Sequence, residues 1–312
     1  MSQRYCWVLL LLFLGSSCHR VKDTIEPKIS HTVQDTYLQS LPSAFPPLSS
    51  QERSENWGKE HFIGKAFAHK LDLYQALTAF KRAEILAPPS LTKRLEELRY
   101  DIFLCYYFGQ KYNDVLFEFD RGPLRTIEES FPPFHDLLVI LYDSYLKLHK
   151  EPLRIAMLET IGHYYPQTKE NLAIGTAIIQ ADFSQLKQFS SKDFVEELRS
   201  TYKAHRKSPA KAQLLNTVLP GAGYLYLGQK QSALTAFCLN ALFIGATYHF
   251  YNHHQIAAGT IFLSFECGWY FGGIFGAGLE AKAYNERLYE ELATPVLHQR
   301  RLFPILNLKH AF

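Results

Sequence analysis

One stretch of the sequence carries almost no charge. Between residues 214 and 279 only two side chains are charged, Lys230 and Glu266. Two segments within it, 232–251 and 256–279, are each long enough to cross the roughly 30 Å hydrocarbon core of a bilayer at about 1.5 Å per helical residue. The short polar link between the two segments predicts an antiparallel helical hairpin in a membrane. A hairpin buried in a soluble core is the alternative.

Glycines recur along the second segment of this hairpin. Gly268, Gly272 and Gly276 are four residues apart and therefore share one helix face. Each would cost a soluble helix about 1 kcal/mol relative to alanine, whereas small residues let membrane helices pack backbone to backbone. The glycines therefore favour a membrane location, and we expect them to mediate helix packing there. Glu266 is a candidate functional residue, because an ionisable group in a membrane helix is expensive.

Proline and glycine interrupt the helical pattern ahead of the hairpin. The order Pro-Gly-x-Gly-x-x-Tyr-x-Gly is formed by Pro220, Gly221, Gly223, Tyr226 and Gly228. This order resembles the entry motif of small bacterial two-helix membrane modules, where it precedes a transmembrane hairpin. The resemblance implies a membrane location rather than an activity. We expect the whole module to span residues 208–294.

The first residues have the three-part order of a secretory signal. Arg4 precedes an apolar run, and small residues follow before Cys18. A cysteine in this place resembles the lipobox of bacterial lipoproteins, which implies removal of residues 1–17 and acylation of Cys18. An ordinary signal peptide and a retained anchor are the alternatives. Residues 18–56 are rich in proline, serine, threonine and charge, and they predict a flexible tether.

The signal predicts export to the bacterial cell envelope, with the folded domains on the periplasmic face of a membrane. Basic residues near both ends of the hairpin would by themselves favour the cytoplasm for these ends. We give the signal more weight, because a two-helix hairpin returns both ends to one side and its link offers no opposing charge.

Residues 57–90 place small and aromatic residues at fixed offsets. Gly64 and Ala76 would let two antiparallel helices approach closely, and Phe67 and Phe80 would fill the space between them. Pro88 would end the second helix. This order resembles the tetratricopeptide repeat (TPR), a helix–turn–helix unit that stacks on its neighbours.

Two degenerate copies of this pattern follow at intervals of 39 residues, so the resemblance extends over about 57–168. Residues 169–207 have the apolar spacing of capping helices. We therefore expect an all-α fold, with a TPR-like domain over 57–207 followed by the membrane hairpin. A generic helical bundle is the alternative for the first domain, and the tail at 295–312 has no predicted role.

TPR proteins bind peptides or partner proteins along a concave groove formed by the first helix of each repeat. The resemblance implies a groove lined by His61, Lys65, His69, Tyr100, Leu104, Tyr107, Asp143 and Lys147. Mixed charge with two tyrosines suits a peptide better than a phosphate polymer. For any single one of these residues, a solvated helix face is the alternative.

The charge balance argues against nucleic-acid binding. The chain has 33 Lys and Arg against 30 Asp and Glu, a net charge of +3, so it lacks the basic excess that neutralises phosphates. Phosphate-binding glycine loops, His-Glu-x-x-His, Gly-x-Ser-x-Gly and Cys-x-x-Cys motifs are absent from the sequence. We therefore predict no enzymatic activity, no cofactor and no resident metal.

The predicted function is that of an envelope scaffold or adaptor, which binds a protein or peptide partner while anchored to membrane lipid. The alternative is a membrane transport or metal-handling component. Its chemistry would use Glu266 and the histidines at the hairpin tip, His249, His253 and His254, which could approach one another around a metal.

Overall fold

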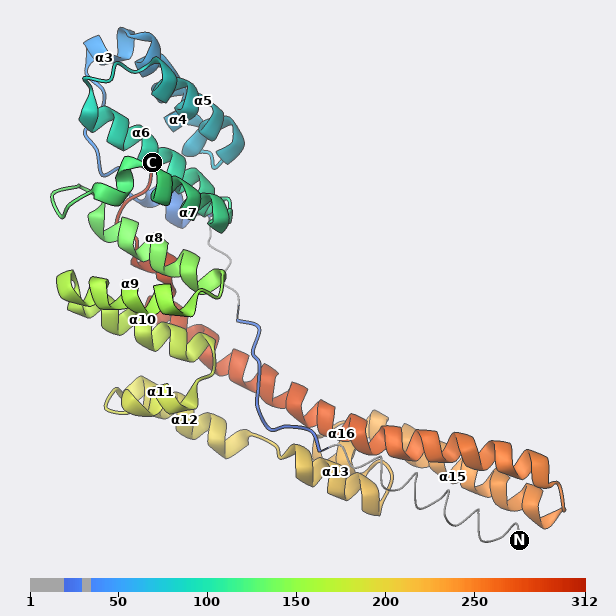
Figure 1. The fold of residues 1–312 in the computed structure, drawn as a ribbon. Coiled ribbons are helices and arrows are strands. Elements are labelled where there is room, and N and C mark those ends of the chain that lie inside the picture. The colour runs from blue at the N-terminus through green and yellow to red at the C-terminus, as the bar shows by residue number, and fades with distance from the viewer. Residues whose placement is uncertain (1–19, 30–34) are drawn as a thin grey trace. The chain divides into compact units, whose positions relative to one another are not determined.

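The computed structural model describes residues 20–29 and 35–312, and these fold into helices (Figure 1). The all-α prediction is confirmed: the described residues contain no β-strand, only one isolated bridge between Ser43 and Ala311. The signal segment and Cys18 lie outside the described residues.

The described helices follow one another without interruption by other regular structure. In chain order they are α2 (Asp35–Ser40), α3 (Ser50–Ser54), α4 (Asn56–Ala68), α5 (Leu73–Leu86), α6 (Thr92–Phe108), α7 (Tyr112–Arg121), η1 (Pro123–Thr126), α8 (Phe134–Lys147), α9 (Glu151–Tyr164), α10 (Pro166–Ile179), α11 (Phe183–Gln188), α12 (Asp193–His205), α13 (Pro209–Val218), α14 (Ala222–Tyr226), α15 (Lys230–Asn252), α16 (Ile256–Gln299) and η2 (Pro304–Asn307).

These helices form two compact units. Unit 1 contains the described residues up to Ile29 together with Ile179–Pro295, and unit 2 contains the described residues from 35 to 178 together with Val296–Phe312. The C-terminal tail, to which the sequence assigned no role, is therefore part of unit 2. Helices α11 and α12, which we expected to cap the repeat domain, belong to unit 1.

The same type of turn joins the two helices of three pairs in unit 2, namely α4 and α5, α6 and α7, and α8 and α9. Leu71, Gln110 and His149 stand at intervals of 39 residues, and each has the left-handed conformation, with φ of 57°, 57° and 54°. The residue after each one donates its N–H to a carbonyl five residues back: Asp72 to Phe67, Lys111 to Tyr106 and Lys150 to Tyr145. The interval between the predicted repeat copies is thus also the interval between identical turns.

The first pair, α4 and α5, packs through the small residues that the sequence singled out. A Cβ atom on Gly64 would lie only 2.6 Å from the ring of Phe80. Ala76, Phe80 and Ala83 have no exposed surface. The core continues through α6 and α8, whose largest fully buried side chains are Leu98, Tyr100, Ile102, Phe103, Leu104, Leu137, Ile140, Leu141 and Tyr142.

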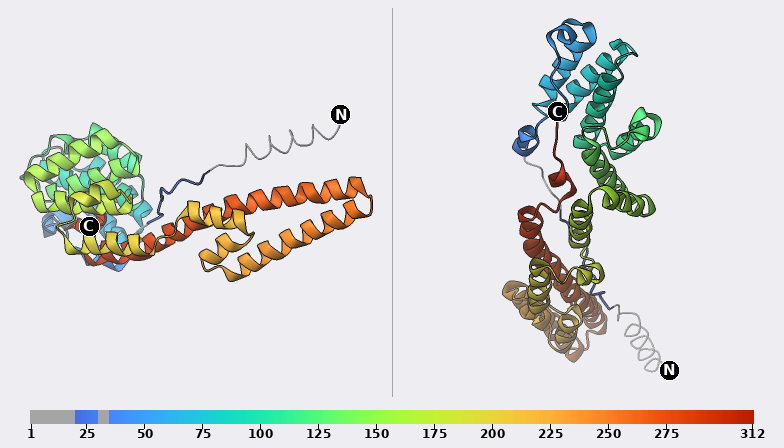
Figure 2. Two further views of the ribbon diagram at one scale, coloured as in Figure 1. Left: turned by 90° about the horizontal axis from the view of Figure 1, so that it is seen from below. Right: turned by 90° about the vertical axis from the view of Figure 1, so that its left-hand side faces the viewer.

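In unit 1, α15 and the first half of α16 form an antiparallel hairpin, and the two helices run side by side in Figure 1 and in the left-hand view of Figure 2. Phe250 stacks on Phe262 with ring centroids 5.1 Å apart, and Phe243 lies 6.3 Å from Phe262. At the tip, His254 has a positive φ of 58° and the N–H of Gln255 bonds to the carbonyl of Phe250 at 2.9 Å.

Residues 20–29 and 35–56, the described part of the predicted flexible tether at 18–56, make defined contacts. Residues 20–29 lie along α16, where the N–H of Glu26 bonds to Glu286 and that of Lys28 bonds to Glu290. Further on, α2 and α3 are helical, and Ser49 forms a capping box with Glu52. Composition indicated disorder here because the partners of these residues are far away in the sequence.

The tail and α10 lie so close together that one added methyl group on α10 should change the stability of unit 2. A Cβ atom on Gly175 would lie 2.1 Å from the carbonyl oxygen of Leu302. We expect Gly175→Ala to destabilise unit 2, because overpacking costs about 1–3 kcal/mol while the gain in helix propensity is about 1 kcal/mol. In Gly162→Ala, the matched control on α9, the new methyl group meets only the flexible side chain of Lys169. Denaturant unfolding of the full chain in detergent, followed by hydrogen exchange in unit 2, would measure both; equal stability of the two variants would contradict the expectation.

Candidate functional site

The eight predicted groove residues lie on or at the end of α4, α6 and α8, the first helix of each pair. We call the side of these helices on which the C-terminal tail packs the inner face. His69 and Lys147 are exposed and Lys65 is partly exposed. The other five are buried, namely His61, Tyr100, Leu104, Tyr107 and Asp143. The structure thus brings the predicted residues together but covers most of them.

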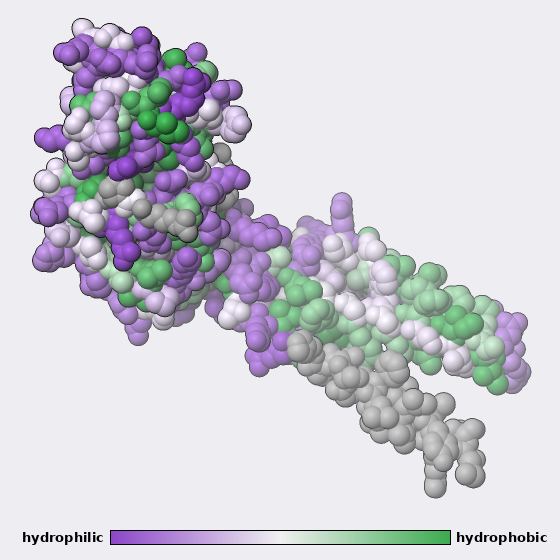
Figure 3. Space-filling view, turned by 45° about the horizontal axis from the view of Figure 1, so that its top comes forward, coloured by the Kyte–Doolittle hydropathy of each residue, from purple (hydrophilic) through white to green (hydrophobic). Residues whose placement is uncertain are grey.

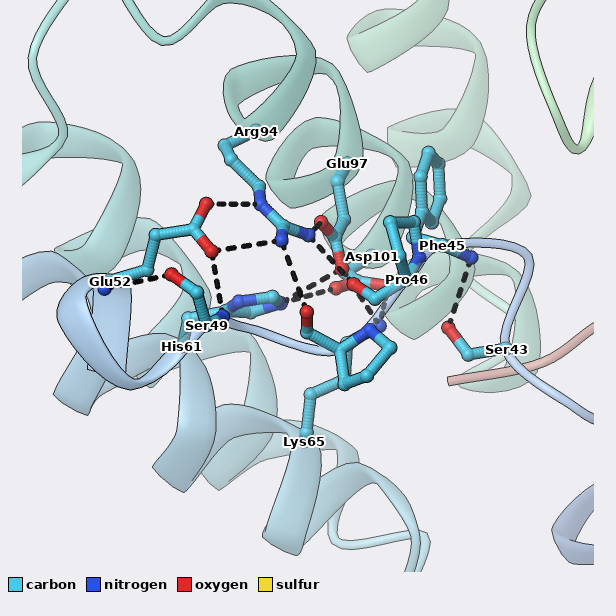
Figure 4. Close-up of polar contacts among 11 residues, drawn as sticks. Ser43, Phe45, Pro46, Ser49, Glu52, His61, Lys65, Arg94, Glu97 and Asp101 are labelled. Carbon is cyan, nitrogen blue, oxygen red and sulfur yellow. Dashed lines mark hydrogen bonds and ion pairs between the residues drawn. The ribbon is translucent and has the colours of Figure 1, made fainter.

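A buried carboxylate, that of Asp101, ties α4 to α6 (Figure 4). It accepts a hydrogen bond from Lys65 Nζ at 2.8 Å, and its other oxygen lies 3.1 Å from His61 Nε2. Burial alone would raise the pKa of Asp101, but the charge of Lys65 and the contact with His61 outweigh burial and hold this pKa below its ordinary value. Asp101 is therefore ionised, and it explains why His61 and Lys65 point inward.

Arg94 joins a second part of the same cluster to α3. Its guanidinium donates to Glu97 at 2.6 Å, to both oxygens of Glu52 at 2.8 and 3.1 Å, and to the carbonyl of Pro46 at 2.9 Å (Figure 4). The bond from Arg94, helped by the N–H of Ser49, lowers the pKa of Glu52 to about 2. Burial, together with the charge of Asp101, raises the pKa of Glu97.

The cluster also contains the donor set of a possible metal site. One ligand atom each of His61, Glu97 and Asp101 lies within 4.8 Å of the others. However, Lys65 and Arg94 already lie on the two carboxylates, so the positive charge is supplied by the protein itself. We interpret the cluster as an ion-pair network that fixes α3, α4 and α6 to one another.

A third buried carboxylate, that of Asp143, connects α8 to α6. It accepts a hydrogen bond from the hydroxyl of Tyr107 at 2.8 Å. Burial raises the pKa of Asp143, and the nearby charge of Lys147 partly opposes this. Two of the predicted groove residues therefore bond to each other.

The C-terminal tail covers the deeper part of the inner face. The ring of Phe312 lies 6.2 Å from that of Phe80 and 5.5 Å from that of Phe108. Leu308 and Phe312 belong to the same apolar core as Tyr100 and Leu104. In the right-hand view of Figure 2 the tail runs along the helices of unit 2.

Asp136, which the sequence analysis missed, holds this tail. It has no exposed surface and accepts the N–H groups of Lys309 and His310 at 3.1 and 2.8 Å. The ring nitrogens of His135 and His310 lie 2.8 and 3.0 Å from it. The sequence gives one indication of this role, because Asp136 is an acidic residue inside the apolar run from Phe134 to Leu141. This pattern does not reveal that the tail is its partner.

A pocket of about 230 Å³ remains open at the edge of the inner face. It is lined by His61, Lys65 and His69 from the predicted groove, and by Arg53 and Phe62. Glu97 also lines it, so the pocket combines charges of both signs with an aromatic wall, and its volume suits a side chain rather than a whole helix.

The hairpin matches the membrane prediction in part. Of the helices that the structure describes, α15 alone is long and apolar enough to cross a membrane. The second predicted span forms the start of α16 and falls short, because Glu266 and the glycines make it less apolar. Gly276 packs against the Tyr224 hydroxyl, whereas a Cβ atom on Gly268 or Gly272 would meet nothing within 4 Å.

The predicted entry motif, Pro220, Gly221, Gly223, Tyr226 and Gly228, forms the turns that lead from α13 through α14 to α15. Asn216 accepts the N–H groups of Gly221 and Gly223 at 2.8 and 3.3 Å. Gly221 has a φ of +92°, and a Cβ there would lie 2.3 Å from the carbonyl oxygen of Ala233. Glycine is required here for both reasons.

The structure gives little support to chemistry at the hairpin tip. His249 and His253 lie close, with ring centroids 4.2 Å apart. Among the described residues, however, the one group of three possible metal donors is the α4–α6 cluster, so neither Glu266 nor His254 completes a site with them. Glu266 is 8% exposed, and its Oε2 has no hydrogen-bond partner among the described residues.

Comparisons of the chain with protein-family models, curated proteins and solved structures find no match.

We expect Asp101→Asn to destabilise unit 2 by about 3 kcal/mol, because Lys65 and His61 lose their nearest anion and keep only Glu97, at 3.8 and 3.5 Å. Asp120→Asn, the same change at an exposed position of α7, serves as the control and should cost less than about 0.5 kcal/mol. Denaturant unfolding of the full chain measures both. Equal unfolding midpoints would show that Asp101 does not hold the cluster together.

Acid should weaken the α3–α6 contact through Glu52. Because folding lowers the pKa of Glu52 from 4.5 to about 2, its contribution to stability is present above pH 4.5 and is lost as the pH falls toward 2. We expect Glu52→Gln to lose part of the stability at neutral pH and to unfold with a smaller pH dependence between pH 4.5 and 2. Arg94→Gln should likewise reduce the pH dependence of stability between pH 4.5 and 2. An unchanged pH profile in Glu52→Gln would contradict the assignment.

Proposed function

We propose that this protein is a non-enzymatic scaffold or adaptor of the bacterial cell envelope, anchored in a membrane by the α15–α16 hairpin. The exposed apolar surface of α15 carries the proposal. Only 11% of its most apolar stretch is buried. The helix has 23 residues, which is enough to span about 34 Å.

The same apolar surface extends over both helices of the hairpin (Figure 3). Leu234, Leu242 and Ile244 on α15 are 65%, 62% and 56% exposed, and Ile261 and Phe265 on α16 are 56% and 60% exposed. Each Å² of such surface costs roughly 25 cal/mol in water, and soluble monomers avoid continuous patches of this kind. A bilayer is the occupant that fits, because the length of α15 matches a hydrocarbon core of about 30 Å.

The adaptor role is inferred from unit 2. A TPR-like domain is supported by the identical turns at Leu71, Gln110 and His149 and by the close approach of Gly64 to Phe80. Stacked helix pairs of this kind present extended faces to partners. The signal segment and Cys18 would add export and a lipid anchor, and the proposed location of unit 2 is therefore the periplasmic face of a membrane.

Insertion can be tested with one charged residue on α15. We expect Ile244→Asp to weaken membrane association roughly 100-fold, since an acid at the centre of a membrane helix costs about 2.5–3.5 kcal/mol. Flotation with phospholipid vesicles measures it, in a Cys18→Ser background so that acylation does not anchor the chain. Ile85→Asp changes an 83% exposed isoleucine of α5 and is the matched control. If Ile244→Asp floats like wild type, the hairpin is not the anchor.

A further inference from the structure

The geometry points to the inner face of unit 2 as a groove for a peptide, occupied here by the chain's own residues 302–312, which form the short helix η2 and then an extended end. We call these residues the tail. We propose that a segment of the same chemistry, supplied by a partner, can take the place of the tail. This deepens the proposed adaptor function and rests on it, because it names the class of partner that the domain binds.

The tail is held mainly by contacts that another peptide could reproduce. Asp136 binds it through the backbone N–H groups of Lys309 and His310, and the N–H of Ala311 bonds to the carbonyl of Pro42 at 2.9 Å. Every peptide carries such donors, except at proline. On the other side, the carbonyls of Leu306 and Leu308 accept from the hydroxyl of Tyr37 at 3.2 and 3.4 Å.

Two of the buried side chains of the tail lie in its extended end, beside the backbone contacts to Asp136. Leu308 is 2% exposed and Phe312 is 3% exposed, and the ring of Phe312 lies against Phe80 and Phe108. The preferred ligand is therefore an extended segment with bulky apolar residues four positions apart, the second of them aromatic. It has no proline at the three positions before the aromatic residue, because their N–H groups are used.

Asp136 makes the groove dependent on an occupant. Without the tail, the carboxylate would keep His135 as a donor but lose both backbone N–H groups and His310. A segment that supplies the same donors restores these bonds and covers the carboxylate again, which favours its binding. The chain can also be cut just before the tail, because residues 298–301, the last two of α16 and the two that follow it, are exposed.

The test is an exchange experiment on the full chain in detergent. A recognition sequence for a site-specific protease is inserted after Arg300, and the folded protein is cut there. A fluorescent peptide with the sequence of residues 301–312 is then added, and its anisotropy is followed. We expect saturable binding to the cut protein, competition by the unlabelled peptide and no binding to the uncut chain, whose tail occupies the groove.

Changes in the peptide test the contacts without disturbing the fold of the protein. N-methylation at the positions of Lys309 and His310 removes the donors to Asp136 and should weaken binding at least about tenfold. The Phe312→Ala peptide should bind roughly 100-fold more weakly. Substitution of the exposed Lys309 by Gln is the control and should change affinity little.

The proposal is overturned if the cut protein, still helical by circular dichroism, does not take up the peptide, and if a folded chain truncated after Arg301 does not bind it either. Equal binding of the N-methylated peptide would also overturn the assigned contacts. The measurement uses no membrane, so its outcome is independent of whether the hairpin inserts.

Discussion

Buried carboxylates determine how the inner face of unit 2 is assembled. Asp101, Asp136 and Asp143 are 1%, 0% and 5% exposed, and a buried charge is tolerated only where donors meet it. Each is met by a different element: α4 reaches Asp101, the tail reaches Asp136, and α6 reaches Asp143. The first helices of the three pairs and the tail therefore cannot change places without taking a donor away from a buried carboxyl group.

This constraint acts on specificity more than on net stability. Apolar residues of similar volume in place of a buried ion pair are often as stable, whereas removal of one partner is expensive. Glu97 and Asp136 show what the charges add, because they lie 39 residues apart at the same position of successive pairs. Glu97 is met by Arg94 of its own helix, and Asp136 is met by the tail. Helix pairs with the same turn are thus distinguished by their buried partners.

The sequence predicted what depends on local pattern. Gly64, Ala76 and Phe80 lie where the helix pair needs small and aromatic residues, and the turns recur at the predicted interval. It did not predict what depends on distant pairs. His61 was expected in an open groove but is buried against Asp101, 40 residues away, and the tail meets Asp136 across 173 and 174 residues. The helical and repeat periodicities of the sequence do not indicate such a pairing, because each partner on its own is an ordinary polar residue.

The hairpin differs from unit 2, because much of its apolar surface is exposed and is not covered by another described element. Along the glycine stripe of α16, Gly276 is used within the unit, where Tyr224 fills the space beside it. Gly268 and Gly272, two and one turns nearer the tip, have nothing against them and border a cavity of about 550 Å³ that Asn240 also lines. The open end of the hairpin is therefore closed by protein, while no described side chain fills the space beside Gly268 and Gly272. A buried carboxylate orders unit 2 because water is excluded from it; in the proposed membrane location, a bilayer would exclude water from the exposed apolar surface of α15 in the same way.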